Sequence, residues 1–315
     1  MKLKTVVIIG STGSIGRQTI QALKKINALE KRFEIIGIAA NKSELFIEQL
    51  HRLNLQGYVF GRKIPDCSVQ YFDDVGKMIE ALHPDYCVIA SGGSQTLRFT
   101  MSAVKHSSRV CLANKESLVM AGSAIKDSAK KHHTQIIPVD SEHSSVFQLV
   151  QGECLEDIEK IVITASGGAL RDWPLEKQQN ASVEDVLKHP NWEMGPKITV
   201  DSATLFNKGL EVIEASEFFD IEKERIQTAF CYSSYIHALV LFKDGSIKLH
   251  AGKPNMVIPI AYSLTYPRRL LRDANVVLDM NKLALKPMEL NKYPAVEMAY
   301  EVLEGHNSKR ITYNA

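Results

Sequence analysis

The sequence predicts an α/β fold that begins with a doubly wound parallel sheet and continues into an α+β domain. Short apolar runs alternate with amphipathic stretches up to about residue 150, and the alternation then stops. Strands that alternate with helices pair in parallel through right-handed crossovers. A glycine-rich turn follows the first apolar run, where open α/β sheets bind ligands.

Six segments have the length and apolar character of buried strands. They are Thr5–Ile9, Glu34–Ala39, Gly57–Phe60, Tyr86–Ala90, Arg109–Ala113 and Gln135–Val139. Helix-like segments lie between most of them. Ile15–Ile26 is an example, because Ile15, Ile20, Leu23 and Ile26 recur with the 3.6-residue period of a one-sided helix.

The bulk composition excludes several classes of protein. The formal net charge of +2 gives no general reason to expect nucleic acid or a membrane surface as a partner. No apolar run approaches the roughly 20 residues that span a bilayer. The five cysteines include no C-x-x-C pair and are expected to be reduced thiols. We therefore expect a cytoplasmic protein with two domains.

The first strand–helix junction reads Gly10-Ser11-Thr12-Gly13-Ser14-Ile15-Gly16. Such glycines allow a tight turn, a close approach of the backbone to a pyrophosphate, and helix–strand packing. The helix N-terminus would hold the phosphates. The spacing is G-x-x-G-x-x-G and not the commoner G-x-G-x-x-G, so a purely structural turn is the alternative. The position favours a Rossmann-type dinucleotide site.

The end of the second strand bears on the choice of cofactor. An acidic residue there would bind the ribose 2′-hydroxyl of NAD, but this chain has Ala40-Asn41-Lys42. A cation suits a 2′-phosphate, so NADP is favoured. Lys42 as an ordinary loop residue is the alternative, and the nearby Glu44 weakens the inference.

Asp140 and Glu142 form a candidate metal site at the end of the sixth expected strand. At the end of a strand, residues i and i+2 point the same way, so the two carboxylates can share one ion. Glu211 is a third candidate ligand. Oxygen ligands without nearby cysteine or paired histidine favour Mg²⁺ or Mn²⁺ over zinc. The alternative for the Asp-Ser-Glu triplet is an exposed turn.

The second half carries further polar motifs. Thr164-Ala165-Ser166-Gly167-Gly168 follows a strand and could cradle an oxyanion or phosphate, or be a simple glycine turn. The turn-rich segment 188–196 contains Trp192 and is a candidate lid, although a tryptophan packed on the core is equally compatible.

A helix is expected around Asn207, Lys208 and Glu211. Asp201 or Ser202 is expected to cap it. The amide, ammonium and carboxylate would lie on neighbouring rows of one face, suited to a ligand with a phosphate and a metal-bound oxygen. A surface ion pair between Lys208 and Glu211 is the alternative.

Six motifs together resemble the 1-deoxy-D-xylulose 5-phosphate reductoisomerase family. They are GSTGSIG, LANKES, PVDSEHS, TASGG, KHPNWEMG and DSATLFNKGLEVIEA, in family order across nearly the whole chain. The resemblance implies NADPH- and divalent-metal-dependent isomerisation and reduction of 1-deoxy-D-xylulose 5-phosphate to 2-C-methyl-D-erythritol 4-phosphate, in non-mevalonate isoprenoid synthesis. It also suggests a homodimer that acts on a small sugar phosphate.

The resemblance assigns roles to individual residues. The implied cofactor contacts are Gly10, Thr12, Gly13, Ser14, Ile15, Ala40, Asn41, Lys42, Asn114, Glu116 and Gly195. The implied metal ligands are Asp140, Glu142 and Glu211, which count as catalytic together with Lys115. The implied substrate contacts are Lys115, Ser141, Glu142, Ser166, His189, Trp192, Ser202, Asn207, Lys208, Glu211, Ser234 and His237. Trp192 and Met194 belong to the implied lid near residues 187–196.

Two departures from the family pattern have consequences. Cys231-Tyr232-Ser233-Ser234 stands where the family often has His-Pro-Gln-Ser, so only Ser234 is retained. The sequence ends at Ala315, where family members continue into a helical domain. We therefore expect an NADPH-binding domain over 1–150, a catalytic and dimerisation domain over 151–290, and a linker over 291–315 with no helical domain. A catalytically silent, truncated NADP-binding protein and another NADP-dependent dehydrogenase are the alternatives.

Overall fold

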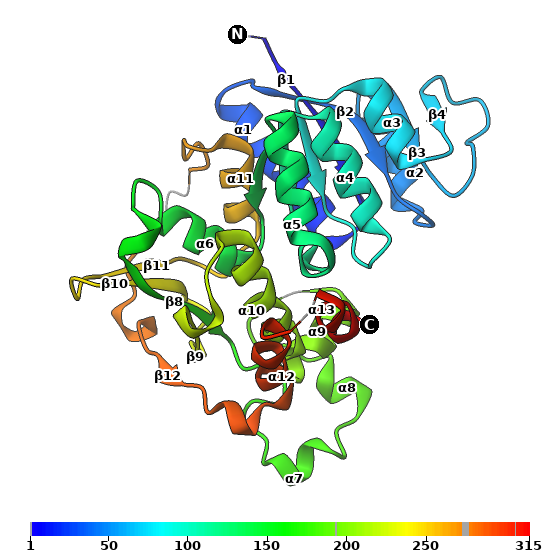
Figure 1. Cartoon of the computed structure of the whole chain (residues 1–315). Helices are drawn as coiled ribbons and strands as arrows, with labels where there is room; N and C mark the ends of the chain where they lie inside the picture. Colours follow the sequence, from blue (N-terminus) through cyan, green and yellow to red (C-terminus); the bar gives the residue numbers. More distant parts are fainter. Residues whose placement is uncertain (1, 193, 273–276, 306) are drawn as a thin grey trace. The chain divides into compact units, whose positions relative to one another are not determined.

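The computed structural model describes residues 2–192, 194–272, 277–305 and 307–315. The chain forms two compact units. Unit 1 consists of Met1–Asp140 and Met256–Ala274, and unit 2 of Ser141–Asn255 and Asn275–Ala315. Figure 1 shows the elements of both units with their labels.

Unit 1 is built on a seven-stranded parallel sheet of order β4-β3-β2-β1-β5-β6-β7. Its strands are β1 (Lys4–Ile9), β2 (Phe33–Ala39), β3 (Gly57–Val59), β4 (Gln70–Phe72), β5 (Tyr86–Ile89), β6 (Arg109–Leu112) and β7 (Gln135–Pro138). All six expected strands are present. The sequence reasoning missed β4, which has three residues and extends the sheet beyond β3. Asp140 therefore follows the seventh strand and not the sixth.

Helices cover both faces of this sheet. They are α1 (Ser14–Leu29), α2 (Leu45–Arg52), α3 (Val75–Leu82), α4 (Thr96–His106), α5 (Lys115–His132) and α11 (Val257–Thr265). The right-handed crossovers place α3, α4 and α5 side by side on one face, and α1 packs against α11 on the other (Figure 1). The strand order reverses between β1 and β5, so the carboxyl ends of these strands form the edge where such sheets bind ligands.

Unit 2 contains a mixed five-stranded sheet of order β11-β10-β8-β9-β12. The strands are β8 (Ile158–Ala165), β9 (Ile226–Phe230), β10 (Ile236–Phe242), β11 (Ile247–Ala251) and β12 (Lys286–Pro287). The α-helices are α6 (Ser141–Leu149), α7 (Leu175–Gln178), α8 (Val183–Val186), α9 (Pro196–Ala203), α10 (Phe206–Phe219), α12 (Pro294–Leu303) and α13 (Asn307–Asn314). The 3-10 turns are η1 (Leu155–Asp157), η2 (Lys223–Arg225), η3 (Met280–Lys282) and η4 (Leu290–Lys292).

The structure corrects three expectations about domain organisation. The expected linker contains two helices, because α12 spans Pro294–Leu303 and packs against α10, and α13 spans Asn307–Asn314 and packs against α12. Met256–Ala274 belongs to unit 1, because Val257, Ile260, Ala261 and Leu264 of α11 join the core around β1 and α1. The first division falls after Asp140, about ten residues before the expected one.

None of the helices traced in the described ranges combines the length and the apolar character required to cross a bilayer.

Candidate functional site

The turn between β1 and α1 has the close packing that its glycines predict. Gly10 has a φ of 87°, and a Cβ there would lie 2.7 Å from the backbone nitrogen of Ser91 in the loop after β5. A Cβ on Gly16 would overlap the Gly10 carbonyl oxygen. Gly13 is the N-cap of α1, so Ser14 and Ile15 start the first turn. Gly10 and Gly16 thus allow the tight turn, and the first amides of α1 lie at its end, where sheets of this kind bind a pyrophosphate.

Asn114 and Glu116 fix the neighbouring loop after β5. Asn114 is the buried N-cap of α5, and its side-chain oxygen accepts from the Ser117 amide at 2.8 Å. Its side-chain nitrogen donates to the Ser91 carbonyl at 3.2 Å and to Glu116 Oε2 at 2.6 Å. Glu116 Oε1 accepts from the Gly93 amide at 3.0 Å. These two predicted cofactor residues thus shape the edge at β5.

The loop after β2 is exposed at Asn41 and Lys42, whereas Ala40 is half-buried. The Ala40 amide donates to the Val59 carbonyl at 3.0 Å, which continues the pairing of β2 with β3. This is the place where the adenine ribose lies in sheets of this kind. The predicted 2′-phosphate residues are therefore accessible at the expected edge of unit 1.

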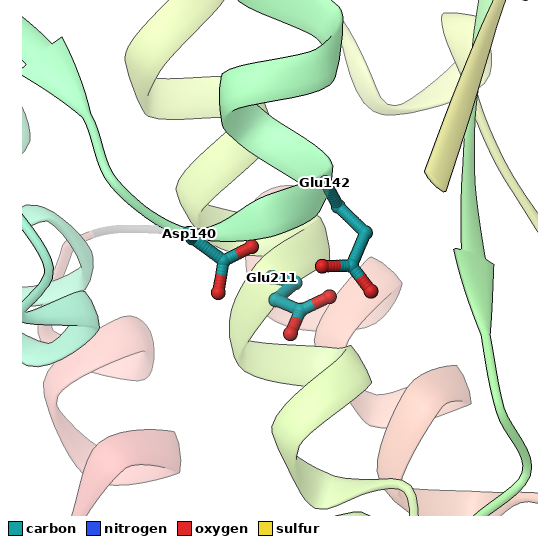
Figure 2. Close-up of side chains that lie close together, drawn as sticks. All are labelled: Asp140, Glu142 and Glu211. Atoms are coloured by element: carbon teal, nitrogen blue, oxygen red, sulfur yellow. The ribbon is translucent and has the colours of Figure 1, made fainter. Parts of the chain in front are cut away.

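Three carboxylates meet where the chain passes from β7 into α6. Asp140, Glu142 and Glu211 each offer an oxygen, and these oxygens lie within 4.8 Å of one another. Figure 2 shows the three side chains pointing toward one another, with Asp140 directly before α6, Glu142 in its first turn, and Glu211 on α10. The separation and the oxygen donors fit a single divalent cation such as Mg²⁺.

The route by which Asp140 and Glu142 converge differs from the predicted one. The strand ends at Pro138 and α6 begins at Ser141, so the two residues do not alternate along a strand. The change from strand to helix turns Glu142 back beside Asp140. The expected pair is present, but the argument from strand alternation was wrong.

Two buried lysines compensate the negative charge of this cluster. Lys115, the first residue of α5, is paired with Asp140 in unit 1. In unit 2, Lys208 is paired with Glu211 and lies 2.9 Å from Glu142 Oε1, and it also donates to the Thr164 carbonyl. Burial alone would lower the pKa of Lys208, but the charges of Glu142 and Glu211 outweigh it and raise the pKa. Lys208 is therefore a cation. It does pair with Glu211, but the pair is buried and is not the surface ion pair considered as the alternative.

Ser166 lies directly after β8 and contacts His189. Its hydroxyl is 2.9 Å from His189 Nε2. His189 Nδ1 accepts from the backbone amides of Asn191 and Trp192 at 3.1 and 3.0 Å. Because Nδ1 is an acceptor, Nε2 carries the proton and donates to Ser166. Burial, with a smaller contribution from the Arg171 charge, lowers the pKa of His189 to about 4 and keeps the ring neutral.

Ser234 is joined to the same part of unit 2 through Asn191. The Asn191 side-chain nitrogen donates to Ser234 Oγ at 2.9 Å and to the Tyr232 carbonyl at 2.7 Å. Arg171 donates to the carbonyls of Ser166 and Tyr232 at 3.0 and 2.9 Å. The segment that departs from the family pattern is thus fastened to the turn after β8.

The helices that carry Ser202 and Asn207 are separate. Asp201 and Ser202 lie inside α9, and α10 begins after Leu205, whose φ is 58°. The prediction that Asp201 or Ser202 caps the helix of Asn207 was therefore wrong. Ser202 nevertheless lies at the turn after β8, because a Cβ on Gly168 would overlap the Ser202 carbonyl oxygen. Asn207 donates to Glu211 Oε1 at 2.5 Å, as the four-residue spacing predicts.

The remaining predicted residues have the following positions. Ser141 Oγ donates to Glu142 Oε2 at 2.5 Å. His237 is buried in β10, with its ring centroid 6.2 Å from that of the half-buried Trp192. Gly195 is the N-cap of α9 in unit 2. Glu193 of the expected lid lies outside the described residues.

Sequence reasoning missed residues that hold the site together. Asn191 belongs to the KHPNWEMG motif, so its polar side chain among turn residues was an available signal. Arg171 had no such signal, because its role depends on the carbonyls of Ser166 and of Tyr232, and Tyr232 is 61 residues away in the chain.

The polar groups of unit 2 suit a ligand that carries a phosphate and chelates a metal. They are hydroxyls, an amide, a neutral histidine and a lysine close to the carboxylate cluster.

The chain matches sequence models of one family along most of its length. Residues 6–122 match 1-deoxy-D-xylulose 5-phosphate reductoisomerase, residues 136–219 match its C-terminal domain, and residues 251–315 match a further model described as a C-terminal domain of the same enzyme.

Curated relatives carry the same name. The protein of Thermotoga neapolitana is 40% identical over 320 residues, which cover 100% of this chain and 83% of that protein. The protein of Bacillus subtilis is 38% identical over 322 residues, covering 95% of this chain and 82% of that protein.

Solved structures agree with this assignment. A reductoisomerase in complex with NADPH, fosmidomycin and magnesium has a TM-score of 0.88 at 31% identity, covering 99% of this chain and 82% of that one. The enzyme of Zymomonas mobilis with NADPH has a TM-score of 0.84 at 32% identity, with 98% and 83% covered. With these relatives, and with the glycine turn and carboxylate cluster in place, the chain belongs to the 1-deoxy-D-xylulose 5-phosphate reductoisomerase family.

Proposed function

We propose that this chain catalyses the NADPH- and divalent-metal-dependent isomerisation and reduction of 1-deoxy-D-xylulose 5-phosphate to 2-C-methyl-D-erythritol 4-phosphate. The observation that carries the proposal is the cluster of Asp140, Glu142 and Glu211 in a chain that also has the glycine turn of a dinucleotide-binding sheet. Another NADP-dependent dehydrogenase would need the turn but not the carboxylate cluster. A catalytically silent protein would need neither the cluster nor the polar residues after β8.

The residues of unit 1 fit the binding of NADPH. Side chains are excluded from the β1–α1 turn at Gly10 and Gly16, and the first amides of α1 face the end of the sheet. Asn41 and Lys42 offer an amide and a cation to the 2′-phosphate. Asn114 and Glu116 hold the loop after β5. Gly195 is a further proposed cofactor contact.

The residues of unit 2 fit the binding of a phosphorylated substrate. The phosphate ligands are proposed to be Ser166, Ser202, Asn207 and Lys208, with contributions from Ser234 and His189. His189 donates to Ser166 Oγ, so the Ser166 hydroxyl hydrogen is free to point at a phosphate oxygen. Binding energy from the phosphate then orients the reacting end of the substrate.

Asp140, Glu142 and Glu211 are proposed to hold Mg²⁺ or Mn²⁺, and Ser141 and Lys115 to contact the substrate. When bound, the cation polarises the substrate oxygens for rearrangement of the carbon skeleton, and NADPH supplies the hydride that reduces the resulting aldehyde. Lys115, buried and paired with Asp140, is placed to stabilise negative charge or to move a proton. Trp192, with Met194, is proposed to exclude water as part of a lid, and His237 packs near its ring.

The test is Glu211→Gln, assayed for NADPH oxidation with 1-deoxy-D-xylulose 5-phosphate and saturating Mg²⁺ or Mn²⁺. Loss of one charged ligand removes several kcal/mol of stabilisation, so we expect kcat to fall about 100-fold or more. NADPH binding, measured by fluorescence, should be unchanged. Glu224→Gln is the control, because that side chain is 66% exposed. Full metal-dependent turnover in Glu211→Gln would remove Glu211 from the metal site.

The wild-type assay also separates the alternatives. Metal-dependent oxidation of NADPH with this substrate supports the proposal, whereas NADPH binding without turnover in folded protein supports a silent protein.

We further propose a cytoplasmic homodimer that binds neither nucleic acid nor membranes. Light scattering coupled to size-exclusion chromatography tests the oligomeric state.

A further inference from the structure

The loop after β3 places two cations beside the predicted 2′-phosphate residues. Ala39 of β2 pairs with Val59 of β3, and this register continues beyond both strands. The Ala40 amide donates to the Val59 carbonyl at 3.0 Å, and the Gly61 amide donates to the Asn41 carbonyl at 3.2 Å. If this register is extended by one residue, the backbone of Arg62 falls opposite that of Lys42.

This loop is fixed at both ends. A Cβ on Gly61 would lie 2.7 Å from the Asn41 carbonyl oxygen, so the close approach of the two loops requires glycine. At the other end, the Ile64 amide donates to the hydroxyl of the fully buried Tyr58 at 2.8 Å. Between these points Phe60 stacks on Phe46, with ring centroids 4.6 Å apart and an interplanar angle of 6°. Arg62 and Lys63 are therefore carried on a well-supported backbone.

The positive charges on these two loops are not neutralised by ion pairs with acidic side chains. Lys42, Arg62 and Lys63 are exposed, and within the described ranges none of them forms an ion pair. Glu44 and Asp66 are the acidic residues near them in sequence, and both are exposed. Like charges carried on neighbouring loops repel one another, and this repulsion falls when an anion binds between them. A phosphate dianion would relieve that repulsion.

We propose that Arg62 is a second determinant of cofactor choice and binds the 2′-phosphate of NADPH together with Lys42. A guanidinium presents paired donors that match phosphate oxygens, whereas a lysine acts as a point charge. The inference rests on the proposed function, since it concerns the cofactor of the same reaction. The proposal adds Arg62, from the loop between β3 and β4, to the predicted 2′-phosphate residues, and no motif in the sequence identifies it.

The test compares binding of 2′,5′-ADP with binding of 5′-AMP by calorimetry, which requires no turnover. Arg62→Ala should weaken 2′,5′-ADP about tenfold, the usual effect of losing one charged hydrogen-bonding group. Binding of 5′-AMP should be unchanged, because it lacks the 2′-phosphate. Arg62→Lys should keep part of the affinity. Arg52→Ala is the matched control, since that arginine lies on α2 in the same unit with its side chain 75% exposed.

Steady-state kinetics give a second readout. The ratio of kcat/KM for NADPH to that for NADH should fall about tenfold in Arg62→Ala and stay constant in Arg52→Ala. Equal weakening of both nucleotides, or no change in either, would overturn the role of Arg62. The proposed function fails separately, if wild-type protein binds 2′,5′-ADP but does not turn over 1-deoxy-D-xylulose 5-phosphate.

Discussion

At the scale of single residues, Lys208 is both buried and charged, two properties that rarely occur together. Its side chain is buried, which disfavours a charge, yet it contacts Glu142 and Glu211 and the Thr164 carbonyl. Breaking a buried pair leaves an uncompensated charge, at a typical cost of about 3 kcal/mol or more. Lys208 therefore balances the charge of these two side chains and holds them close together, where a divalent cation would bind.

His189 leads to a prediction about pH. Its pKa is lowered to about 4 in the folded protein, below the ordinary 6.5. The folded arrangement of residues 189–192 is thus fully stable above pH 6.5 and loses stability as the pH falls toward 4. Protonation of Nδ1 would remove its bonds from the amides of Asn191 and Trp192. We expect Trp192 to change its environment with a midpoint near pH 4.

The measurement uses Trp173→Phe protein, in which Trp192 is the remaining one of two tryptophans. Its fluorescence is titrated from pH 7 downward, with far-UV circular dichroism as a check for global unfolding. His189→Gln in the same background should lack the transition, because glutamine does not titrate. An identical transition in that variant would show that another group is responsible.

At the scale of elements, α13 supports the helix that carries Asn207, Lys208 and Glu211. Tyr313 stacks on Phe206 of α10, with ring centroids 4.7 Å apart, and its hydroxyl donates to the Ala295 carbonyl at 2.7 Å. A Cβ on Gly209 would overlap that hydroxyl, so the helices approach closely because residue 209 is glycine. Arg310 of α13 also forms an ion pair with Glu217 of α10.

We predict that Tyr313→Ala lowers the free energy of unfolding of unit 2 by about 2 kcal/mol, since it removes a half-buried ring and its stacking contact with Phe206. Tyr313→Phe keeps the ring and should cost about 1 kcal/mol or less. Urea unfolding followed by hydrogen exchange on α10 measures both. Thr312→Ala is the control, because it removes only the hydrogen bond from the exposed Thr312 hydroxyl to the Ser308 carbonyl. Equal stability of Tyr313→Ala and Thr312→Ala would contradict the contact.

Some of these helices and strands could be predicted from the sequence, and others could not. The strands of unit 1 were predictable, because buried parallel strands appear as continuous apolar runs. β4 was missed because Gln70-Tyr71-Phe72 is too short to stand out. The break between α9 and α10 was missed because it falls on Leu205 in a left-handed conformation, with neither glycine nor asparagine to signal it.

For the candidate site, residue types were more informative than geometry. Oxygen ligands at Asp140, Glu142 and Glu211 follow from local sequence and from resemblance, and the structure brings them together. The contacts of Lys115 with Asp140 and of Lys208 with Thr164 join segments far apart in the chain, so no local pattern encodes them. The same holds for the bonds of Arg171.

At the scale of the whole molecule, the division into units is not a division of the chain into two consecutive parts. The chain changes unit after Asp140, after Asn255 and after Ala274. Arg109 of β6 donates to the carbonyls of Ser263 and Leu264 at 3.2 Å each, which ties α11 to the sheet of unit 1. Unit 1 is therefore incomplete without residues 256–274.

We predict that a fragment of residues 1–140 aggregates or binds a hydrophobic dye, because the face of α1 that packs on α11 would be exposed. The same fragment with residues 256–274 attached through a flexible linker should be monomeric and retain binding of 2′,5′-ADP. Size-exclusion chromatography and dye fluorescence measure the difference. A stable, monomeric fragment of residues 1–140 would show that α11 is dispensable.

Because α11 belongs to unit 1 but follows Ser141–Asn255 in the chain, unit 1 cannot be completed early during synthesis on the ribosome. The glycine turn and the whole parallel sheet emerge first, yet their apolar surface waits for Val257 and Leu264 until all of Ser141–Asn255 has been synthesised. During that interval the part of the sheet that α11 covers, over β6 and β7 and beside α1, is exposed while the second sheet begins to form. Chaperone protection of the growing chain is thus needed most before residue 256 leaves the exit tunnel.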